Sequence, residues 1–116
     1  MSVTLYGIPN CDTVKKARKW LEAQNIEFQF HDFRKDGLTE QQLTLWCDAL
    51  GWEKVLNKRS TSWRALDDDQ KSDLNQSKAI ALMVEAPTLV RRPVIDHDGQ
   101  YHNGFKDAEY AAFFDL

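Results

Sequence analysis

Cys11 is the residue whose position best suits chemistry, because it stands where two unlike segments meet. The apolar residues 3–6 run into Gly7 and Pro9, and a basic segment with helical spacing begins at Asp12. The start of a helix carries free backbone N–H groups that favour an anion, so a thiolate would be stabilised there. The sequence therefore predicts a nucleophilic thiol at Cys11; the alternative is an inert cysteine that serves as a small apolar residue.

The predicted nucleophile is a single thiol, because Val14 occupies the position where a CxxC motif has its second cysteine. One thiol can form a mixed disulfide, which a second thiol from glutathione or another protein then resolves. The other cysteine, Cys47, lies on the apolar stripe of a predicted helix and is expected to be a buried core thiol. Two cysteines make neither a disulfide framework nor a zinc cluster, so we expect no metal site.

Four cations follow Cys11 within about two helical turns: Lys15, Lys16, Arg18 and Lys19. Cations near a helix N-terminus oppose the macrodipole, so helix stability does not explain them. A thiolate, an oxyanion substrate or a glutathione carboxylate would relieve the repulsion. Asn10 and Lys15 are therefore candidate contacts for an anionic co-substrate, whereas a solvated basic face is the simpler interpretation of each lysine alone.

Arg92-Pro93 forms a second candidate constellation at the start of a predicted strand over residues 92–96. Proline is tolerated as the first residue of a strand. In a thioredoxin-like arrangement the turn before the third strand packs against the thiol-bearing loop, often with a cis X-Pro bond. That placement would aim Arg92 at Cys11, where a guanidinium stabilises a thiolate and binds an oxyanion through two hydrogen bonds. Arg91 is interpreted as a surface arginine.

A basic loop over residues 57–64 is the third constellation and shows no clear period. Lys58 and Arg59 are followed by small hydroxyl residues and by Trp63, a mixture that suits an anion or a peptide-like ligand. It equally suits a protein-docking surface or a solvated loop held by one tryptophan. Lys58 and Arg59 are retained as candidate glutathione ligands.

The elements that must position these residues follow from hydrophobic periodicity. Residues 3–6 predict a buried strand, residues 12–24 a helix, and the alternation over residues 26–32 a half-buried strand, so the chain begins with a β-α-β unit. Residues 92–96 and 100–103 predict a hairpin around Asp98-Gly99. A terminal helix is predicted over residues 107–114, with these residues facing inward: Ala108, Ala111, Ala112 and Phe114.

The element order predicts an α/β protein with a thioredoxin-like fold, β-α-β then β-β-α around a mixed four-stranded sheet, with a helical insertion. One domain spans residues 1–116; residues 1–36 and 91–116 form the core and residues 37–90 the insertion. A capping box of Thr39 and Gln42 and a cap at Asn75 mark two helices of the insertion. Residues 35–37 are interpreted as a break.

The composition is that of an ordinary globular domain, with a net charge of −3 and 42% hydrophobic residues. Nothing in this balance indicates a nucleic acid or membrane partner. No apolar run is long enough to cross a bilayer, and the N-terminus lacks the regions of a signal peptide. We therefore expect a cytoplasmic location.

Four segments together resemble the arsenate reductase-like (ArsC/Spx/YffB) family over the full length, and most closely its YffB branch: residues 6–17, 56–64, 90–95 and 103–105. The resemblance implies a thioredoxin-like fold with a helical insertion and maps the family's nucleophile onto Cys11. It implies three oxyanion-binding arginines, of which one maps onto Arg92. A gapless match puts Asn57 at the first position, with Lys58 or Arg59 reachable by a shift, and no arginine stands at the third.

The residues and the resemblance together predict a monothiol, glutathione-coupled thiol reductase without a bound cofactor. Its expected partners are glutathione and a small oxidised or disulfide substrate, with glutaredoxin as a further candidate. One alternative is a non-enzymatic regulator that binds RNA polymerase, as the Spx branch does, although that branch usually carries CxxC. The other is arsenate reduction, which the incomplete arginine set disfavours.

Overall fold

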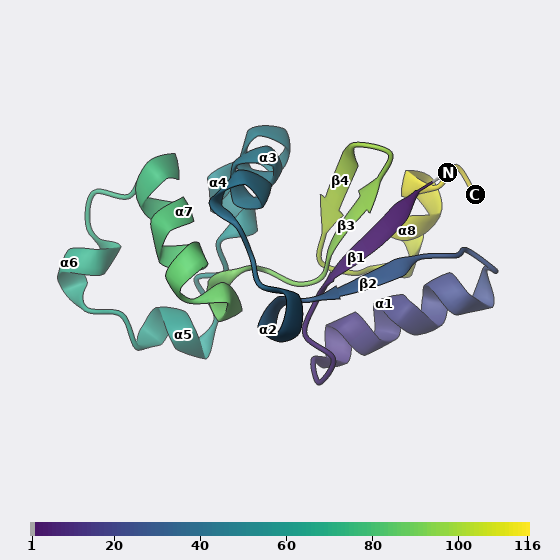
Figure 1. The fold of residues 1–116 in the computed structure, drawn as a ribbon, viewed down its shortest axis with the longest axis horizontal. Coiled ribbons are helices and arrows are strands. Elements are labelled where there is room, and N and C mark those ends of the chain that lie inside the picture. Colours follow the sequence, from purple (N-terminus) through teal and green to yellow (C-terminus); the bar gives the residue numbers. More distant parts are fainter. Residues whose placement is uncertain (1) are drawn as a thin grey trace. The chain divides into compact units, whose positions relative to one another are not determined.

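The computed structural model describes residues 2–116, which divide into two compact units. The first unit comprises the chain up to Gly37 together with Arg92–Leu116, and the second comprises Leu38–Arg91. Figure 1 draws all four strands in the first unit and the helices α3 to α7 in the second. No described helix has the length and apolar character needed to span a membrane.

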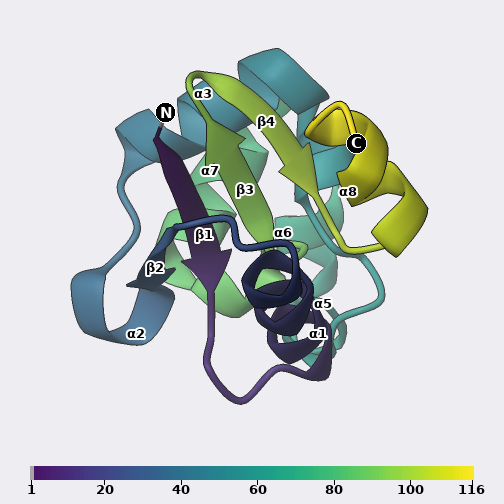
Figure 2. The same ribbon diagram turned by 90° about the vertical axis from the view of Figure 1, so that its right-hand side faces the viewer.

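The first unit is built on a sheet with the strand order β2-β1-β3-β4. Its strands are β1 (Val3–Gly7), β2 (Gln29–Asp32), β3 (Val94–His97) and β4 (Gln100–Asn103). β1 and β2 are parallel and joined by the helix α1 (Asp12–Ala23), whereas β3 is antiparallel to both β1 and β4. Figure 2 shows β3 between β1 and β4. This mixed sheet is the thioredoxin-like arrangement, and the predicted fold class is confirmed.

The β3–β4 hairpin turns at Asp98-Gly99, as the sequence predicts. Both residues have positive φ, 52° at Asp98 and 88° at Gly99, the pair of values that a two-residue hairpin turn requires. The carboxylate of Asp96 accepts a hydrogen bond from the Gly99 N–H at 2.9 Å. This turn fixes the register of the two strands that follow Arg92-Pro93.

The terminal helix α8 (Asp107–Phe113) buries a different face from the one predicted. Tyr110 is fully buried, while Ala108 and Ala112 are exposed, so the inward assignment of these two alanines is wrong. Residues two positions apart on a helix point about 200° apart, so burial of Tyr110 turns both alanines outward. A buried aromatic ring removes far more apolar surface from water than two methyl groups.

The second predicted strand is shorter than expected, because pairing with β1 begins only at Gln29. Ile26 and Phe28 still pack against the core without belonging to the strand. Residues 35 and 36 of the predicted break instead belong to a one-turn helix, α2 (Phe33–Asp36), whose first residue, Phe33, is buried. Gly37 ends this turn with a φ of 78°.

The second unit is helical, as predicted. Its elements are α3 (Glu40–Leu50), α4 (Trp52–Val55), α5 (Thr61–Arg64), α6 (Asp68–Lys71), α7 (Gln76–Glu85) and the 3₁₀ turn η1 (Pro87–Leu89). The capping box of Thr39 and Gln42 and the cap at Asn75 are present. The sequence did not predict α5, a single turn whose N-terminus is capped by the hydroxyl of Ser60. One turn is too short to show a helical period.

Candidate active site

Cys11 is the N-cap residue of α1, with extended backbone angles of φ −96° and ψ 126°. Its backbone is held on both sides: its N–H donates to the Ile8 carbonyl at 3.3 Å, and its carbonyl accepts from the Lys15 N–H at 2.9 Å. The side chain makes no capping hydrogen bond. The thiol is half-buried against the core, so a well-positioned sulfur remains available for reaction.

A close contact between Gly7 and Val14 packs the start of α1 against the end of β1, on either side of the turn that carries Cys11. A Cβ atom on residue 7 would lie 2.8 Å from Cγ2 of Val14, which is closer than real Cβ contacts. Val14 is fully buried in the core. The absence of a side chain on Gly7 therefore lets the first turn of α1 pack directly on the end of β1, and Cys11 is fixed at that junction.

Arg92-Pro93 lies at the same end of the sheet as the thiol-bearing turn. The β1–β3 register pairs Tyr6 with Val94, so the residues before Val94 continue beyond the end of β1, where residues 7–11 begin. The Arg92–Pro93 peptide bond is cis. The Pro93 carbonyl accepts a hydrogen bond from the Gly104 N–H at 2.9 Å, which ties this turn to the end of the hairpin.

The Arg92 guanidinium carries donors that no described residue satisfies. Its Nε and Nη1 atoms are buried and have no hydrogen-bond partner among residues 2–116. A guanidinium stays charged at all ordinary pH values, and a buried charged donor without a partner is costly. Such a group gains free energy when it donates hydrogen bonds to a carboxylate or an oxyanion.

The other predicted ligands divide between the two units. Asn10 is exposed in the turn directly before Cys11, and Lys15 is exposed one helical turn after it. The structure thus brings Asn10, Cys11 and Lys15 together in the first unit. Lys58 and Arg59 belong to the second unit, and their role as glutathione ligands stays a prediction.

Lys58 has an aromatic environment that the sequence pattern did not reveal. Its ammonium nitrogen lies 5.8 Å from the ring centroid of Trp52 and 5.7 Å from that of Trp63. The Lys71 ammonium lies 5.4 Å from the Trp63 ring. These are cation–π distances. The spacing of these four residues follows no regular period, so only the folded chain identifies the cluster.

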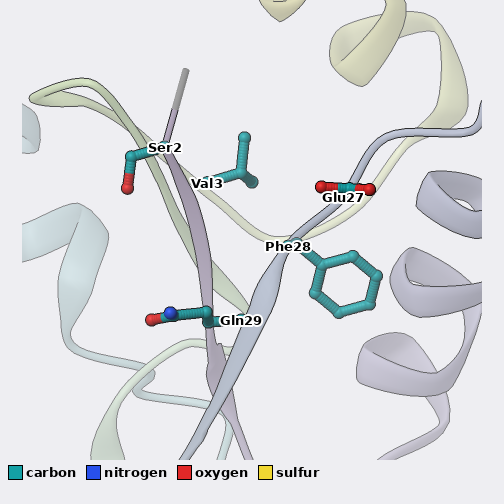
Figure 3. A pocket seen from close by; sticks show the side chains of 5 residues that line it. All are labelled: Ser2, Val3, Glu27, Phe28 and Gln29. Carbon is teal, nitrogen blue, oxygen red and sulfur yellow. The ribbon is translucent and has the colours of Figure 1, made fainter.

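A pocket of about 260 Å³ lies at the opposite end of β1 from Cys11 and carries no comparable chemistry. Figure 3 shows its lining, with the Phe28 ring and the Gln29 amide on opposite sides of their segment. The remaining lining residues are Ser2, Val3 and Glu27. None of the five is a thiol, a histidine or a cation, so this pocket does not compete with the Cys11 end as a reaction site.

The second cysteine is chemically distinct from the first. Cys47 is 2% exposed, which confirms the predicted buried core thiol. Burial, and to a lesser degree the nearby Asp48 carboxylate, raises the pKa of Cys47 from an ordinary 9.0 to about 11. The thiol form therefore dominates at neutral pH, and this side chain is a poor nucleophile.

The fold and the site define a protein of the thioredoxin-like class with one accessible cysteine at the start of the first helix. Within that class, the chain belongs to the ArsC family, whose model matches residues 6–113. The family resemblance seen in the sequence is thereby confirmed.

Relatives match this chain over nearly its whole length. A protein of Haemophilus influenzae described as uncharacterized is 49% identical over 112 residues, 97% of this chain and 98% of its own. The global transcriptional regulator Spx of Streptococcus mutans is 34% identical, over 96% of this chain and 82% of its own. The solved structure of the YffB (PA3664) protein matches with a TM-score of 0.94 and 44% identity, covering 96% of this chain and 97% of its own.

Proposed function

We propose that this chain is a monothiol reductase in which Cys11 attacks a disulfide or another small oxidised substrate and glutathione supplies the electrons. The observation that carries the proposal is that two groups lie at the same end of the sheet: the uncapped thiol of Cys11 and the Arg92 guanidinium, whose buried donors have no partner among the described residues. Membership of the ArsC family supports a thiol-based reaction.

The proposed reaction balances with two equivalents of glutathione. The Cys11 thiolate attacks one sulfur of the substrate disulfide, and the other sulfur leaves as a thiolate. A first glutathione thiolate displaces the remaining substrate half and stays attached to Cys11 as a mixed disulfide. A second glutathione attacks the glutathione sulfur, which releases the Cys11 thiolate and glutathione disulfide. The substrate gains two electrons and two glutathione molecules lose one each.

Arg92 has an electrostatic role in this proposal. Its free Nε and Nη1 donors bind a carboxylate of glutathione and stabilise the negative charge on the attacking and leaving sulfurs. Pro93 is buried, and its carbonyl accepts a hydrogen bond from the Gly104 N–H. Pro93 therefore holds Arg92 at this end of the sheet. Asn10 and Lys15 flank Cys11 and contact the same anionic co-substrate.

Mass spectrometry of the protein incubated with glutathione disulfide tests the proposal. We expect one glutathionyl group on Cys11 and none on Cys47. Cys11→Ser should take no adduct, and Cys47→Ala, the matched control, should behave like the parent. An unmodified Cys11 together with no disulfide reduction in the presence of glutathione would overturn the proposal.

A regulatory role is the second candidate, favoured by the 34% identity to the transcriptional regulator Spx. In this alternative the chain binds RNA polymerase and Cys11 senses the redox state without turning over substrate. A pull-down in which Cys11→Ser captures polymerase as well as the parent does would favour regulation. Failure of both proteins to capture polymerase would exclude it.

Arsenate reduction is the less supported enzymatic variant. Of the three arginine positions that the resemblance implies, the sequence has Arg92 at one, and Asn57 and Asn103-Gly104 match the other two. We therefore expect no turnover in an arsenate assay coupled to glutathione and glutaredoxin. Turnover comparable to that of an arsenate reductase would make arsenate the substrate.

A further inference from the structure

The flank of α1 that continues from Cys11 is basic. Lys15 and Arg18 follow Cys11 by four and seven residues, which places both within about 40° of it around the helix. Lys19 lies beside them. Together with Glu22, these three cations line a surface cavity of about 190 Å³. The cavity therefore lies on the helix face that begins at the thiol.

These cations have no acidic partners of their own. Within residues 2–116, no carboxylate lies within ion-pair distance of Lys15, Arg18 or Lys19, although Glu22 shares the cavity. The Arg18 guanidinium lies 4.6 Å from the centroid of the Phe30 ring of β2, which holds it along the flank of the helix. Three cations and one carboxylate line this cavity, so its surface carries an excess of positive charge.

Only Lys15 lies in the N-terminal part of α1, where positive charge is unfavourable, whereas Arg18 and Lys19 lie in the middle of the helix. The helix macrodipole therefore stabilises none of the three cations. The core side is a different face, centred about 120° around the helix from the basic flank, and is formed by Val14, Ala17 and Leu21. The charge of the basic flank is therefore explained neither by core packing nor by the helix macrodipole.

We propose that Lys15, Arg18 and Lys19 make the site selective for acidic polypeptide disulfides, a substrate class within the thiol reductase activity proposed above. Carboxylates of the polypeptide bind along the flank of α1 while one sulfur of its disulfide reaches Cys11. The exchange is the one already described: Cys11 forms the new S–S bond, the other substrate sulfur leaves as a thiolate, and glutathione supplies the electrons.

The helix geometry specifies where the carboxylates must stand. With a rise of about 1.5 Å per residue, Lys15 and Arg18 lie about 6 Å and 10 Å along the axis from Cys11. An extended peptide advances about 3.3 Å per residue. Side chains two and four residues from the substrate cysteine lie on the same side of an extended peptide as the cysteine, about 7 Å and 13 Å along it. Acidic residues at these two positions therefore match Lys15 and, about 12 Å along the helix axis, Lys19, with Arg18 between them.

A binding experiment on the Cys11→Ser protein tests the surface without requiring turnover. Labelled peptides carry one reduced cysteine with either aspartates or lysines two and four residues away. By fluorescence anisotropy we expect the acidic peptide to bind and the basic one not to bind. Substitution of Lys15, Arg18 and Lys19 together by Gln should weaken binding about tenfold, since each exposed charge is worth about two- to threefold.

Lys16→Gln is the matched control, because it removes the same charge from the same helix. Lys16 is exposed and lies about 140° around the helix from Cys11, away from the basic flank. Its substitution should change affinity less than twofold. Raised salt should weaken acidic-peptide binding to the parent and have a smaller effect on the triple variant.

Three results would overturn the selectivity. They are equal binding of acidic and basic peptides, the same loss in Lys16→Gln as in the triple variant, and equally tight binding of a single-stranded oligonucleotide. Because Cys11→Ser cannot turn over, failure of the thiol reductase proposal leaves the binding result intact. Conversely, if glutathione reduces acidic and basic peptide disulfides equally fast in the presence of the protein, the selectivity proposal fails and the thiol reductase proposal stands.

Discussion

Gly7 and Val14 meet in a contact that leaves no space for a side chain on residue 7, where a Cβ would stand 2.8 Å from Cγ2 of Val14. Gly7 ends β1, and Val14 is in the first turn of α1. The four-residue segment between Gly7 and Asp12 therefore closes over a direct strand-to-helix contact. The position of Cys11 depends on that contact as much as on its own hydrogen bonds.

Gly7→Ala should destabilise the protein by about 1–3 kcal/mol, because α1 or β1 must shift to admit the methyl group. Chemical denaturation measures this loss, and the alkylation rate of Cys11 reports the displaced thiol. In a Val14→Ala background, where the opposing methyls are gone, the same substitution should cost less. An equal cost in both backgrounds would show that the contact is not the cause.

Arg92→Met should have opposite effects on stability and on function. It removes buried donors without a partner, so the free energy of unfolding should rise by about 1 kcal/mol. It also removes the anion ligand, so glutathionylation of Cys11 should slow about tenfold or more. Arg91→Met, at the neighbouring exposed position, should change both quantities little. A loss of stability in Arg92→Met would mean that its guanidinium is satisfied.

Iodoacetamide labelling at pH 8 should distinguish the two cysteines. With a pKa of about 11, Cys47 is about one part in a thousand thiolate at pH 8 and is also shielded by burial. We expect peptide mapping at pH 8 to find the label on Cys11 alone. In denaturant both cysteines should react. Rapid labelling of Cys47 in the native protein would contradict its placement in the core.

Tyr110→Phe should stabilise the protein, because the buried Tyr110 hydroxyl has no hydrogen-bond partner among the described residues. The expected gain is about 1–3 kcal/mol, and Tyr110→Ala should instead lose about 3–5 kcal/mol. Both are measured by thermal or chemical denaturation. If Tyr110→Phe is less stable than the parent, an unseen partner holds the hydroxyl.

The same residue gives a pH dependence with a defined sign. Burial raises the pKa of Tyr110 above its ordinary value of 10.0. The unfolded chain therefore releases this proton at lower pH than the folded chain does, and stability is lost as pH rises above about 10. Tyr110→Phe should reduce that alkaline loss. Identical alkaline profiles for the parent and the variant would contradict it.

The sequence predicted features that local chemistry determines. Asp98-Gly99 specified a tight hairpin turn because few residues accept two consecutive positive φ values. Thr39 and Gln42 specified a helix start because their side chains satisfy backbone N–H groups reciprocally. The placement of Cys11 as the N-cap of α1 followed from the Gly-Pro turn before it.

Features that depend on distant contacts were not predictable. The buried face of α8 was assigned from its alanines, but the helix rotates to bury Tyr110 against rings such as Trp20, whose centroid lies 5.5 Å away. The unmet donors of Arg92 and the aromatic surroundings of Lys58 also depend on packing rather than on sequence spacing. The thioredoxin-like element order indicated the end of the sheet at which Arg92 lies, but not that its donors would be unsatisfied.

The pairing of Tyr6 with Val94 has a consequence for the order in which a growing chain acquires its site. Translation delivers Cys11 early, whereas Arg92 and the strand that completes the central sheet follow some eighty residues later. Until β3 inserts beside β1, the nascent chain carries Cys11 without Arg92 at the same end of the sheet. The thiol's environment is therefore acquired only near the end of synthesis, when the two distant parts of the first unit join.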